Sequence, residues 1–502
     1  MNARTARTAL VRVLVATAVG LTWLDTGVAA APTLRPDIAL DGALLPAPVG
    51  EAFYNAPEPL PGNPGDVVWA TLSPAPVTDV YGVDTTWTAL PVFNRPSGPV
   101  TPEVYRVLYH STDRKGRSVP AFALVVVDPN RGPDAPMIVA MHGWVGFGDH
   151  CGVMRSDDRG RLVAAPNLIH RYVSRGYVLV IPDGPGMGGR GVATPMIKGD
   201  AARNLIDAAR SAQRLTKTDG RVLFHGHSLG GMMVMSVPDE AATYAPNLRI
   251  GGIMSLAGLG YNGPGTSAWL SVSQGQALPM LIYARMLMSA YDGEIDVLRH
   301  VTPRGRARLQ QIENACSIHL GMIAGGDMFE KLFKPSFTPF LNRMATDIPT
   351  RSNVPLHVIT PVSDNTVSSL PHQHAYLRRC KNGQPTFSTI VDAYHANVTS
   401  IAHENPAVRE WVVNALEGSG VGTGCGDLRM TLNVGYAYTA QTLLLTYADT
   451  SSTGELLLAA RGNCRVHQKQ LALGFSGRCA FSITEKFKKR TGRIWHFEAD
   501  IL

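Results

Sequence analysis

The chain has 502 residues, of which 45% are hydrophobic and 17% charged, and its formal net charge is +7. The positive charge is spread along the sequence, whereas a nucleic-acid-binding protein would gather it on one face. The densest basic run, from Lys486 to Arg493, contains a Thr-Gly pair between alternating apolar residues and is interpreted as a solvated hairpin end. Composition therefore argues against a nucleic-acid partner.

Residues 1–30 have the pattern of a secretory signal peptide. Arg4, Arg7 and Arg12 precede a largely apolar stretch from Val13 to Leu24, and residues 28–30 supply small side chains for a cleavage site. The apolar stretch is too short to cross a bilayer, so a membrane anchor is the less favoured interpretation. Because no second long apolar run follows, we expect a soluble mature protein that is secreted, either extracellular or retained in a periplasm.

The six cysteines predict up to three disulfides, since an exported chain meets oxidising conditions. They are Cys151, Cys316, Cys380, Cys425, Cys464 and Cys479. The sequence leaves the pairing open, although Cys464 and Cys479 lie close together in one β-rich segment. No two cysteines have C-x-x-C spacing, and His372-Gln373-His374 has no further ligands nearby, so we expect no metal site.

The order of apolar runs divides the chain into regions. Residues 31–66 are rich in Pro, Ala and Gly and predict an extended N-terminal arm. Within residues 67–418, short apolar runs alternate with helical patterns; the runs are 106–109, 121–127, 137–141, 177–181, 222–224 and 250–254. Runs of this kind are typical of strands that are buried on both faces of a parallel sheet. The alternation predicts a doubly wound α/β domain.

Two further segments depart from this alternation. Residues 259–350 contain methionine-bearing helical patterns, which predicts a helical cap inserted between two strands of the sheet. A glycine-rich linker, residues 418–426, precedes residues 427–502, where apolar residues alternate with a period of two. The last segment is therefore predicted to be a small all-β domain.

Ser228 lies in a G-x-S-x-G pattern at residues 226–230. The apolar run Val222-Leu223-Phe224 precedes it and residues 232–235 can continue as a helix, which is the strand–turn–helix context of a nucleophile elbow. Small neighbours are needed because the sharp turn crowds the backbone on both sides of the serine. The pattern predicts that Ser228 is a nucleophile and that the backbone N–H of Leu229 points at a developing oxyanion.

A serine nucleophile on such a sheet needs an acid, a histidine base and a second oxyanion donor. The acid and base should follow the serine in the order Asp, His, which selects Asp364 in a loop after a strand and His395 after the next β-like run. The second donor would be the backbone N–H of Trp144, which follows the run 137–141 in His142-Gly143-Trp144.

Competing candidates for the acid and base are Asp392 and His403. His403 falls in Ala402-His403-Glu404-Asn405-Pro406, which we interpret as the start of a helix that ends near Trp411. We therefore expect His403 to lie at the surface.

Residues 184–189 match the dinucleotide-binding pattern G-x-G-x-x-G directly after a strand. A dinucleotide fold requires a helix to begin inside that pattern. Here Pro185 interrupts it, Gly191 extends the loop, and the helical pattern resumes only near Ala201. The segment is interpreted as a glycine-rich active-site loop, and no cofactor is expected.

With these motifs in place, the sequence resembles the secretory lipase family (fungal lipase A-like) of the α/β-hydrolase superfamily. The matching stretches are residues 105–113 with Gly116, His142-Gly143, residues 176–183, the serine pattern, residues 244–250, and the loops of Asp364 and His395. The resemblance spans about residues 65–418. It implies a Ser228–Asp364–His395 triad, a lid-bearing cap at 259–350, and disulfides joining Cys151 to Cys316 and Cys380 to Cys425. The β segment after residue 425 and the bulky Trp144 depart from the family and bear on acyl specificity.

The sequence thus predicts a secreted serine carboxylic-ester hydrolase, a lipase or esterase, that forms an acyl-enzyme on Ser228. An extracellular polyester depolymerase is an alternative, because the β segment could hold a polymer surface. A secreted serine aminopeptidase would use the same triad but needs an acidic site for the substrate amine, and none is identifiable. A binding protein on an inactive hydrolase fold is disfavoured by the intact Ser–Asp–His order. Acyl chain length, metal dependence and oligomeric state are not specified by the sequence.

Overall fold

The structure, a computed structural model, covers most of the chain between residues 40 and 421 and the strands of the C-terminal segment. The described residues are 40–72, 77–78, 93–95, 98–152, 154–155, 162–163, 168, 171–191, 193–258, 278–291, 293–316, 327–344, 352–361, 364, 367, 379–380, 382–421, 447–449, 456–462, 477–487 and 490–501. The predicted signal peptide lies outside them. No helix in this part of the chain is long and apolar enough to span a bilayer.

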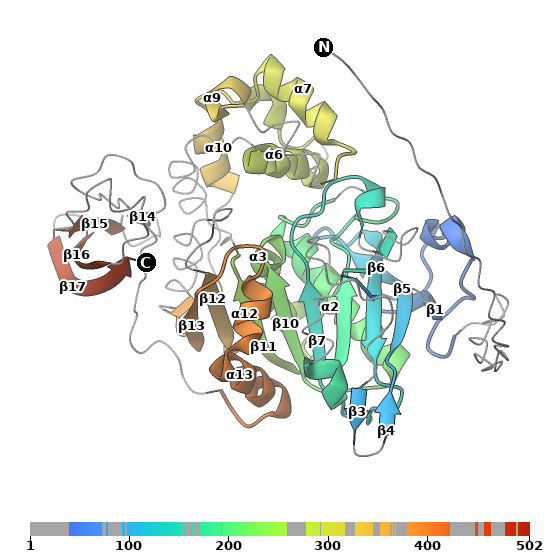
Figure 1. Ribbon diagram of the computed structural model, residues 1–502. Coiled ribbons are helices and arrows are strands. Elements are labelled where there is room, and N and C mark those ends of the chain that lie inside the picture. Colours follow the sequence, from blue (N-terminus) through green and yellow to red (C-terminus); the bar gives the residue numbers. More distant parts are fainter. Residues whose placement is uncertain are drawn as a thin grey trace, which may run out of the picture. The chain divides into compact units, whose positions relative to one another are not determined.

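A nine-stranded sheet forms the centre of the main domain, in the order β1-β5-β6-β9-β7-β10-β11-β12-β13 (Figure 1). The strands from β9 to β13 run parallel, whereas β1, β5 and β6 form an antiparallel edge. The strands are β1 (Val67–Leu72), β5 (Glu103–Thr112), β6 (Ser118–Val127), β7 (Met137–Met141), β9 (Val178–Pro182), β10 (Val222–His227), β11 (Ile250–Leu256), β12 (Leu356–Pro361) and β13 (Thr386–Val391).

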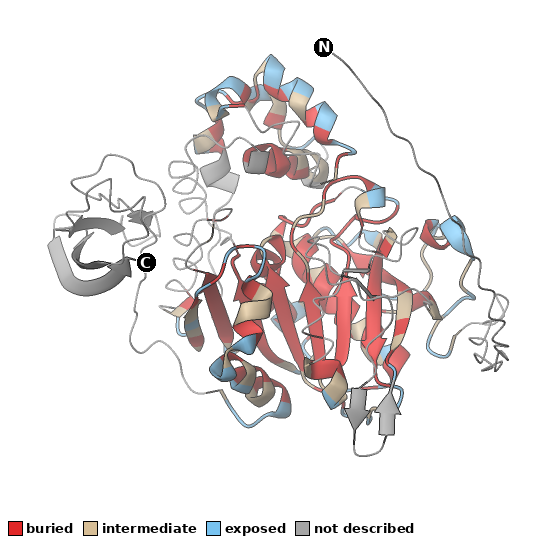
Figure 2. Ribbon diagram, viewed as in Figure 1, coloured by how far each residue is buried: buried red, intermediate tan, exposed pale blue. Residues whose placement is uncertain are grey.

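Both faces of this sheet are buried, as the continuous apolar runs predict (Figure 2). On β10, Val222 and Phe224 belong to one hydrophobic cluster, whereas Leu223 belongs to the other. The helices packed on the sheet are α2 (Lys198–Thr216), α3 (Leu229–Val234), α4 (Val237–Tyr244), α12 (Val398–Glu404) and α13 (Pro406–Glu417). Helix α2 belongs to the first cluster and helices α12 and α13 to the second. Burying each large aliphatic or aromatic side chain contributes about 1.5–3 kcal/mol.

Helix α2 shows why the local sequence folds this way. Leu205, Ala208, Ala209 and Ala212 recur at helical spacing and are all buried. The helix begins at Lys198, slightly before the predicted start, and ends where Lys217 takes a left-handed conformation with φ 52°. A small-residue stripe lets the helix pack closely on the strands beneath it.

Most of the described residues of the predicted cap segment are helical. Its helices are α6 (Leu278–Tyr291), η5 (Val297–His300), α7 (Pro303–Ile312), α9 (Phe329–Leu332) and α10 (Phe337–Met344). Helix α7 begins with Thr302, whose hydroxyl accepts the N–H of Gly305, and with a proline at its first position. Met280 and Met286 are buried in the same hydrophobic cluster as helix α2, and filling apolar space is the usual role of helical methionines.

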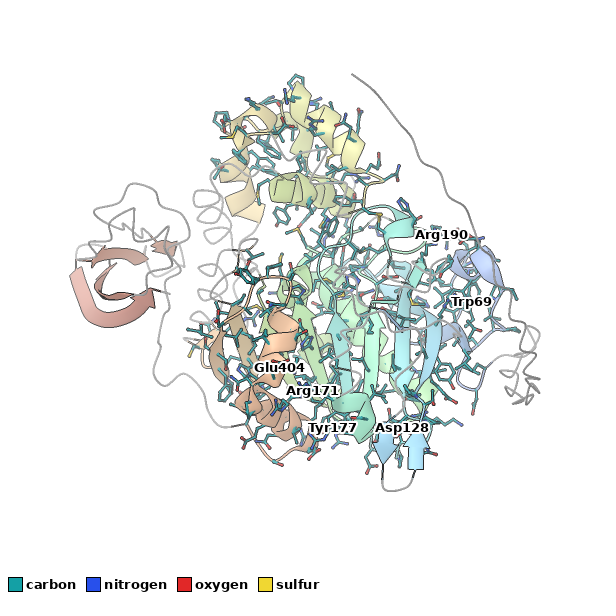
Figure 3. All side chains as sticks on the ribbon, in the orientation of Figure 1. Trp69, Asp128, Arg171, Tyr177, Arg190 and Glu404 are labelled. Carbon is teal, nitrogen blue, oxygen red and sulfur yellow. A yellow bond between two sulfur atoms is a disulfide. The ribbon has the colours of Figure 1, made fainter. Side chains whose placement is uncertain are left out.

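The predicted N-terminal arm contributes to the core of the main domain. It contains the short helix η1 (Gly50–Tyr54), and Phe53 and Tyr54 are buried against Phe122. Trp69 of β1, labelled in Figure 3, donates its indole N–H to the carbonyl oxygen of Phe53 at 3.1 Å. This part of the arm is therefore packed against the sheet edge.

The C-terminal segment forms its own antiparallel sheet, as the period-two pattern predicts. Its strands are β14 (Tyr447–Asp449), β15 (Leu456–Gly462), β16 (Gly477–Phe487) and β17 (Arg490–Ile501), in that order. Phe487 pairs with Arg490, so the β16–β17 hairpin closes inside the basic run of residues 486–493. The predicted pair Cys464–Cys479 lies outside the residues whose side chains are described.

The remaining short elements are β2 (Val77–Thr78), β3 (Phe93–Arg95), β4 (Gly98–Val100), β8 (Leu162–Val163), η2 (Asp149–Cys151) and η4 (Val173–Arg175).

Candidate active site

Ser228 occupies the turn between β10 and α3. Its backbone has φ 55° and ψ −117°, a conformation that non-glycine residues rarely adopt and that costs on the order of 1–3 kcal/mol. The flanking glycines are required sterically: a Cβ on Gly226 would lie 2.1 Å from the carbonyl oxygen of Gly230, and one on Gly230 would lie 2.2 Å from that of Met141. The strained strand–turn–helix geometry predicted from the G-x-S-x-G pattern is therefore present.

Ser228, His395 and Asp364 form one hydrogen-bonded chain. The hydroxyl Oγ of Ser228 lies 2.8 Å from Nε2 of His395, and Nδ1 of His395 lies 2.8 Å from Oδ2 of Asp364. The other carboxylate oxygen of Asp364 accepts the backbone N–H of Val367 at 2.8 Å. In this arrangement the Nδ1–H of His395 donates to the carboxylate, which leaves Nε2 free of hydrogen and able to accept the serine proton.

The competing candidates lie elsewhere. Asp392 is exposed, in the loop after β13. His403 is completely buried: its Nδ1 lies 2.9 Å from the Tyr172 hydroxyl, and its Nε2 lies 3.1 Å from Nε2 of His225. Burial, with His225 next in effect, holds the pKa of His403 well below its usual range.

The expected surface position of His403 is wrong. His403 lies in the last turn of α12, and a second helix, α13, begins at Pro406 with Asn405 as its N-cap. The polar neighbours of His403 in the sequence mark the break between two helices. The helix face that carries His403 packs on the sheet, where His225 and Tyr172 provide polar partners that no local pattern reveals.

The segment of Trp144 follows β7 and contacts the serine turn. Nδ1 of His142 donates to the carbonyl oxygen of Gly143 at 2.6 Å, while Nε2 of His142 lies 3.7 Å from Oδ1 of Asp183. The partly buried Trp144 ring packs edge-on against Phe147, with ring centroids 4.7 Å apart. A Cβ on Gly230 would also lie 2.6 Å from the carbonyl oxygen of His142, so this segment and the first turn of α3 are in direct contact.

The glycine-rich loop after β9 does not have the geometry of a dinucleotide site. Helix α2 begins only at Lys198, so no helix opens within residues 184–189. Gly188 has φ 80°, and a Cβ there would lie 2.9 Å from Oδ2 of the fully buried Asp183. The glycines let the loop pack closely around this aspartate, which is also the neighbour of His142.

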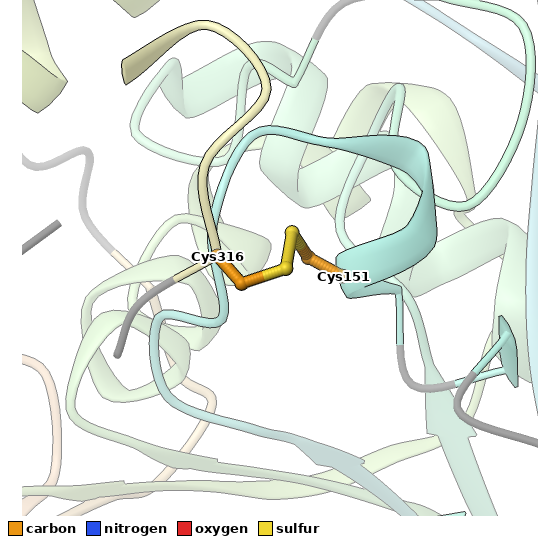
Figure 4. The surroundings of a disulfide bond; sticks show 2 residues. All are labelled: Cys151 and Cys316. Atoms are coloured by element: carbon orange, nitrogen blue, oxygen red, sulfur yellow. A yellow bond between two sulfur atoms is a disulfide. The ribbon is translucent and has the colours of Figure 1, made fainter. Parts of the chain in front are cut away.

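A disulfide between Cys151 and Cys316 joins this region to the cap (Figure 4). Cys151 ends η2, and Cys316 follows α7; close by, the N–H of Phe147 donates to the carbonyl oxygen of Ala315 at 3.1 Å. The resemblance implied this pairing. Cys380 is also disulfide-bonded, and its expected pairing with Cys425 falls outside the described residues.

Among the residues described, one group has the spacing of metal ligands: His150, Cys151 and Cys316. Its two sulfur atoms form the disulfide, so they do not provide the thiolates that a zinc ion would bind.

His227 also contacts His395, although no pattern in the sequence indicated this contact. Its Nε2 lies 2.8 Å from the carbonyl oxygen of His395, and the two rings pack with centroids 5.0 Å apart. Burial, and then the neighbouring His395, lower the pKa of His227 to about 3. Because His227 stands at a variable position of the G-x-S-x-G pattern, the motif carries no signal for its contact.

Solved structures share this architecture, although neither a family model nor a curated protein matches the sequence. The cell wall degrading esterase LipA from Xanthomonas oryzae is 16% identical; the match covers 71% of this chain and 100% of that chain, with a TM-score of 0.53. Candida antarctica lipase A in its closed state is 15% identical, with 72% and 84% covered and a TM-score of 0.53. At such identities the likeness concerns the fold: the main domain has the α/β-hydrolase fold, as predicted.

Proposed function

We propose that the protein is a serine hydrolase of carboxylic esters and that Ser228, Asp364 and His395 are its catalytic triad. The observation that carries the proposal is the continuous Ser228–His395–Asp364 chain, with 2.8 Å at each link, on a strained turn. Two proteins of the same fold are an esterase and a lipase, which favours esters as the substrate class.

The geometry supports an acyl-enzyme mechanism. Ser228 Oγ attacks the ester carbonyl carbon while Nε2 of His395 takes the hydroxyl proton. His395 then gives this proton to the leaving alcohol oxygen, and the acyl group stays on Ser228. A water molecule attacks the acyl carbon as His395 takes its proton, and the acid is released when the proton returns to Ser228. Asp364 holds the imidazole in the required tautomer and stabilises it when it is protonated.

The oxyanion of each tetrahedral intermediate would be bound by the backbone N–H groups of Leu229 and Trp144. Leu229 is the first residue of α3, so its N–H is one of those that have no partner within the helix. The close packing of Gly230 on the carbonyls of Met141 and His142 supports a fixed placement of the Trp144 segment beside that helix start. Removing one such donor from a hydrolase costs about 10²–10³ in kcat.

We also propose that the protein is secreted. The signal-peptide pattern of residues 1–30 and the disulfide between Cys151 and Cys316 support export, because structural disulfides persist in oxidising compartments.

The test is hydrolysis by the purified chain without residues 1–30. A series of p-nitrophenyl esters of increasing acyl length would be run beside an emulsified triglyceride, a polyester film and peptide anilides. Ester hydrolysis supports the proposal, whereas hydrolysis of the anilides alone would favour an aminopeptidase.

The variant Ser228→Ala provides the first prediction. It should fold normally and lose on the order of 10⁴–10⁶ in kcat, because the members of a triad act as a unit. Asp364→Asn should lose a large part of the activity, while the exposed Asp392→Asn is the matched control and should keep it. Retention of more than about 1% of kcat by pure Ser228→Ala would contradict the assignment.

A further inference from the structure

Strand β10 places two histidines on the same face of the sheet, directly before Ser228. His225 and His227 are both buried, and each contacts a histidine from the chain after β13. His225 meets His403 of α12, and His227 meets His395. The two contacts are similar in residue type and in burial, but only one of them involves the proposed base.

The contact of His227 is a hydrogen bond to the backbone of His395. A carbonyl oxygen only accepts, so Nε2 of His227 must carry the hydrogen and donate it across the 2.8 Å separation. The rings of the two residues are also in contact, inclined by 45°. Both the backbone and the ring of His395 are therefore held by a side chain from the strand that leads into Ser228.

We propose that His227 is a positioning residue that fixes the proposed base His395 relative to Ser228. This inference rests on the proposed function. His395 lies in the loop between β13 and α12, where local order comes from short contacts such as the Tyr394 N–H bond to Oδ1 of Asn397 at 2.8 Å. The His227 bond ties that loop to β10, and Ser228 is the next residue along the backbone. Strand β10 therefore holds both Ser228 and, through His227, the loop of His395, which fixes the distance between Oγ of Ser228 and Nε2 of His395.

The electrostatics suit this role. Because its pKa is lowered to about 3, His227 is neutral at ordinary pH and donates without placing a second positive charge beside the imidazolium that forms on His395. Displacement of a catalytic group by about 1 Å can cost 10²-fold in rate.

The experiment compares matched variants of the purified chain without residues 1–30. His227→Met and His227→Phe remove the donor, the second of them keeping an aromatic ring. His227→Gln keeps an N–H near the position of Nε2. His225→Met removes the neighbouring buried histidine from the same strand and face, and serves as the control for loss of packing. Each variant is measured by thermal unfolding, by kcat and KM on a p-nitrophenyl ester, and by the rate at which a fluorophosphonate probe labels Ser228.

We expect both donor-free variants to lose about 10- to 100-fold in kcat and in labelling rate, with KM within about threefold of the parent. His227→Gln should lose less kcat and labelling rate than His227→Met and His227→Phe, because it keeps a donor. His225→Met should keep kcat within about threefold of the parent, even if its melting temperature falls as much as that of His227→Met. Equal kcat losses in His225→Met and His227→Met, or full activity in a donor-free variant, would overturn the proposal. Labelling without any ester hydrolysis in the parent would instead reject the substrate class and leave the positioning comparison measurable.

Discussion

Asp207 and a group of buried histidines lie on opposite faces of the central sheet, and burial shifts their pKa values in opposite directions. On the α2 face, Asp207 is completely buried and its Oδ2 accepts the hydroxyls of Ser111 at 2.9 Å and Tyr244 at 2.8 Å. Burial raises its pKa to about 6, although Arg210 lies 3.2 Å from its other oxygen. The α12 and α13 face, called the histidine face below, buries several histidines, and burial lowers the pKa of His225 to about 4 and of His357 to about 3.

The opposite pKa shifts of Asp207 and the histidines have one cause, because burial favours the neutral form of each side chain. For a carboxyl group this means a raised pKa, and for an imidazole a lowered one. The buried Asp207 is therefore penalised when the pH rises, and the buried histidines are penalised when it falls. The histidine face includes His227, which contacts the proposed base His395, so acid acts directly beside the proposed active site.

The largest expected effect on stability is a loss in mild acid. A histidine with a depressed folded pKa stabilises the fold above its unfolded value, near 6.5, and this contribution is lost as the pH falls toward about 4. Each such histidine contributes a slope of about 1.4 kcal/mol per pH unit. The lowered pKa values of His225, His227 and His357 should each reduce the free energy of unfolding by roughly 2 kcal/mol between pH 7 and pH 5, and His403 acts in the same direction.

Urea unfolding at pH 8, 7, 6 and 5 measures this dependence directly, with the slope giving the number of protons taken up on unfolding. If the free energy of unfolding stays constant down to pH 5, the buried histidines must already become protonated in the folded state, and the prediction is wrong.

A single substitution on the histidine face should have a smaller effect, and one that changes with pH. His357 donates or accepts one hydrogen bond, to Oγ1 of Thr389 at 2.8 Å, and its ring packs edge-on against Trp411 at 4.8 Å. His357→Phe keeps the ring contact and loses the bond, which should cost about 1 kcal/mol at pH 8. At pH 5 the same variant should equal or exceed the parent in stability, because one titrating group has been removed. An identical change in unfolding free energy at both pH values would show that His357 does not take part in the acid sensitivity.

The three residues that the structure joins by hydrogen bonds could be selected from the sequence, because the chemistry proposed for them constrains residue types and order. The Ser228 turn needs glycines on both sides, and the acid and base follow the serine along the chain, so Asp364 and His395 could be selected over Asp392 and His403. The central strands were predictable because a strand buried on both faces must be continuously apolar. The disulfide from Cys151 to Cys316 was implied by resemblance and not by spacing.

The buried polar contacts could not be predicted, because each joins residues far apart in the chain. His403 meets His225 across 178 positions, and its own neighbours in the sequence are polar, so it suggested a surface residue. Asp207 lies near Arg203 and Arg210 in a helix, where charged residues usually face solvent; its partners Ser111 and Tyr244 come from other elements. His227 occupies a position in its motif that many residue types can fill.

The smallest expected effect belongs to the α2 face and has the opposite pH dependence. Asp207 has a raised folded pKa, so its contribution is most favourable below the unfolded value of 3.8 and is lost as the pH rises through about 6. At pH 8 the parent must bury a carboxylate. Asp207→Asn removes that charge, keeps an acceptor for the two hydroxyls and loses the attraction to Arg210, so a net gain of about 1 kcal/mol is expected at pH 8. At pH 5, where the parent carboxyl is largely protonated, the gain should vanish.

The measurement compares the unfolding free energies of Asp207→Asn and His357→Phe with that of the parent at pH 8 and pH 5. From pH 8 to pH 5 the stability relative to the parent should fall for Asp207→Asn and rise for His357→Phe. If Asp207→Asn is destabilised equally at pH 5 and pH 8, the bonds of the carboxylate to Ser111, Tyr244 and Arg210 outweigh its burial, and the two faces do not differ in the way proposed.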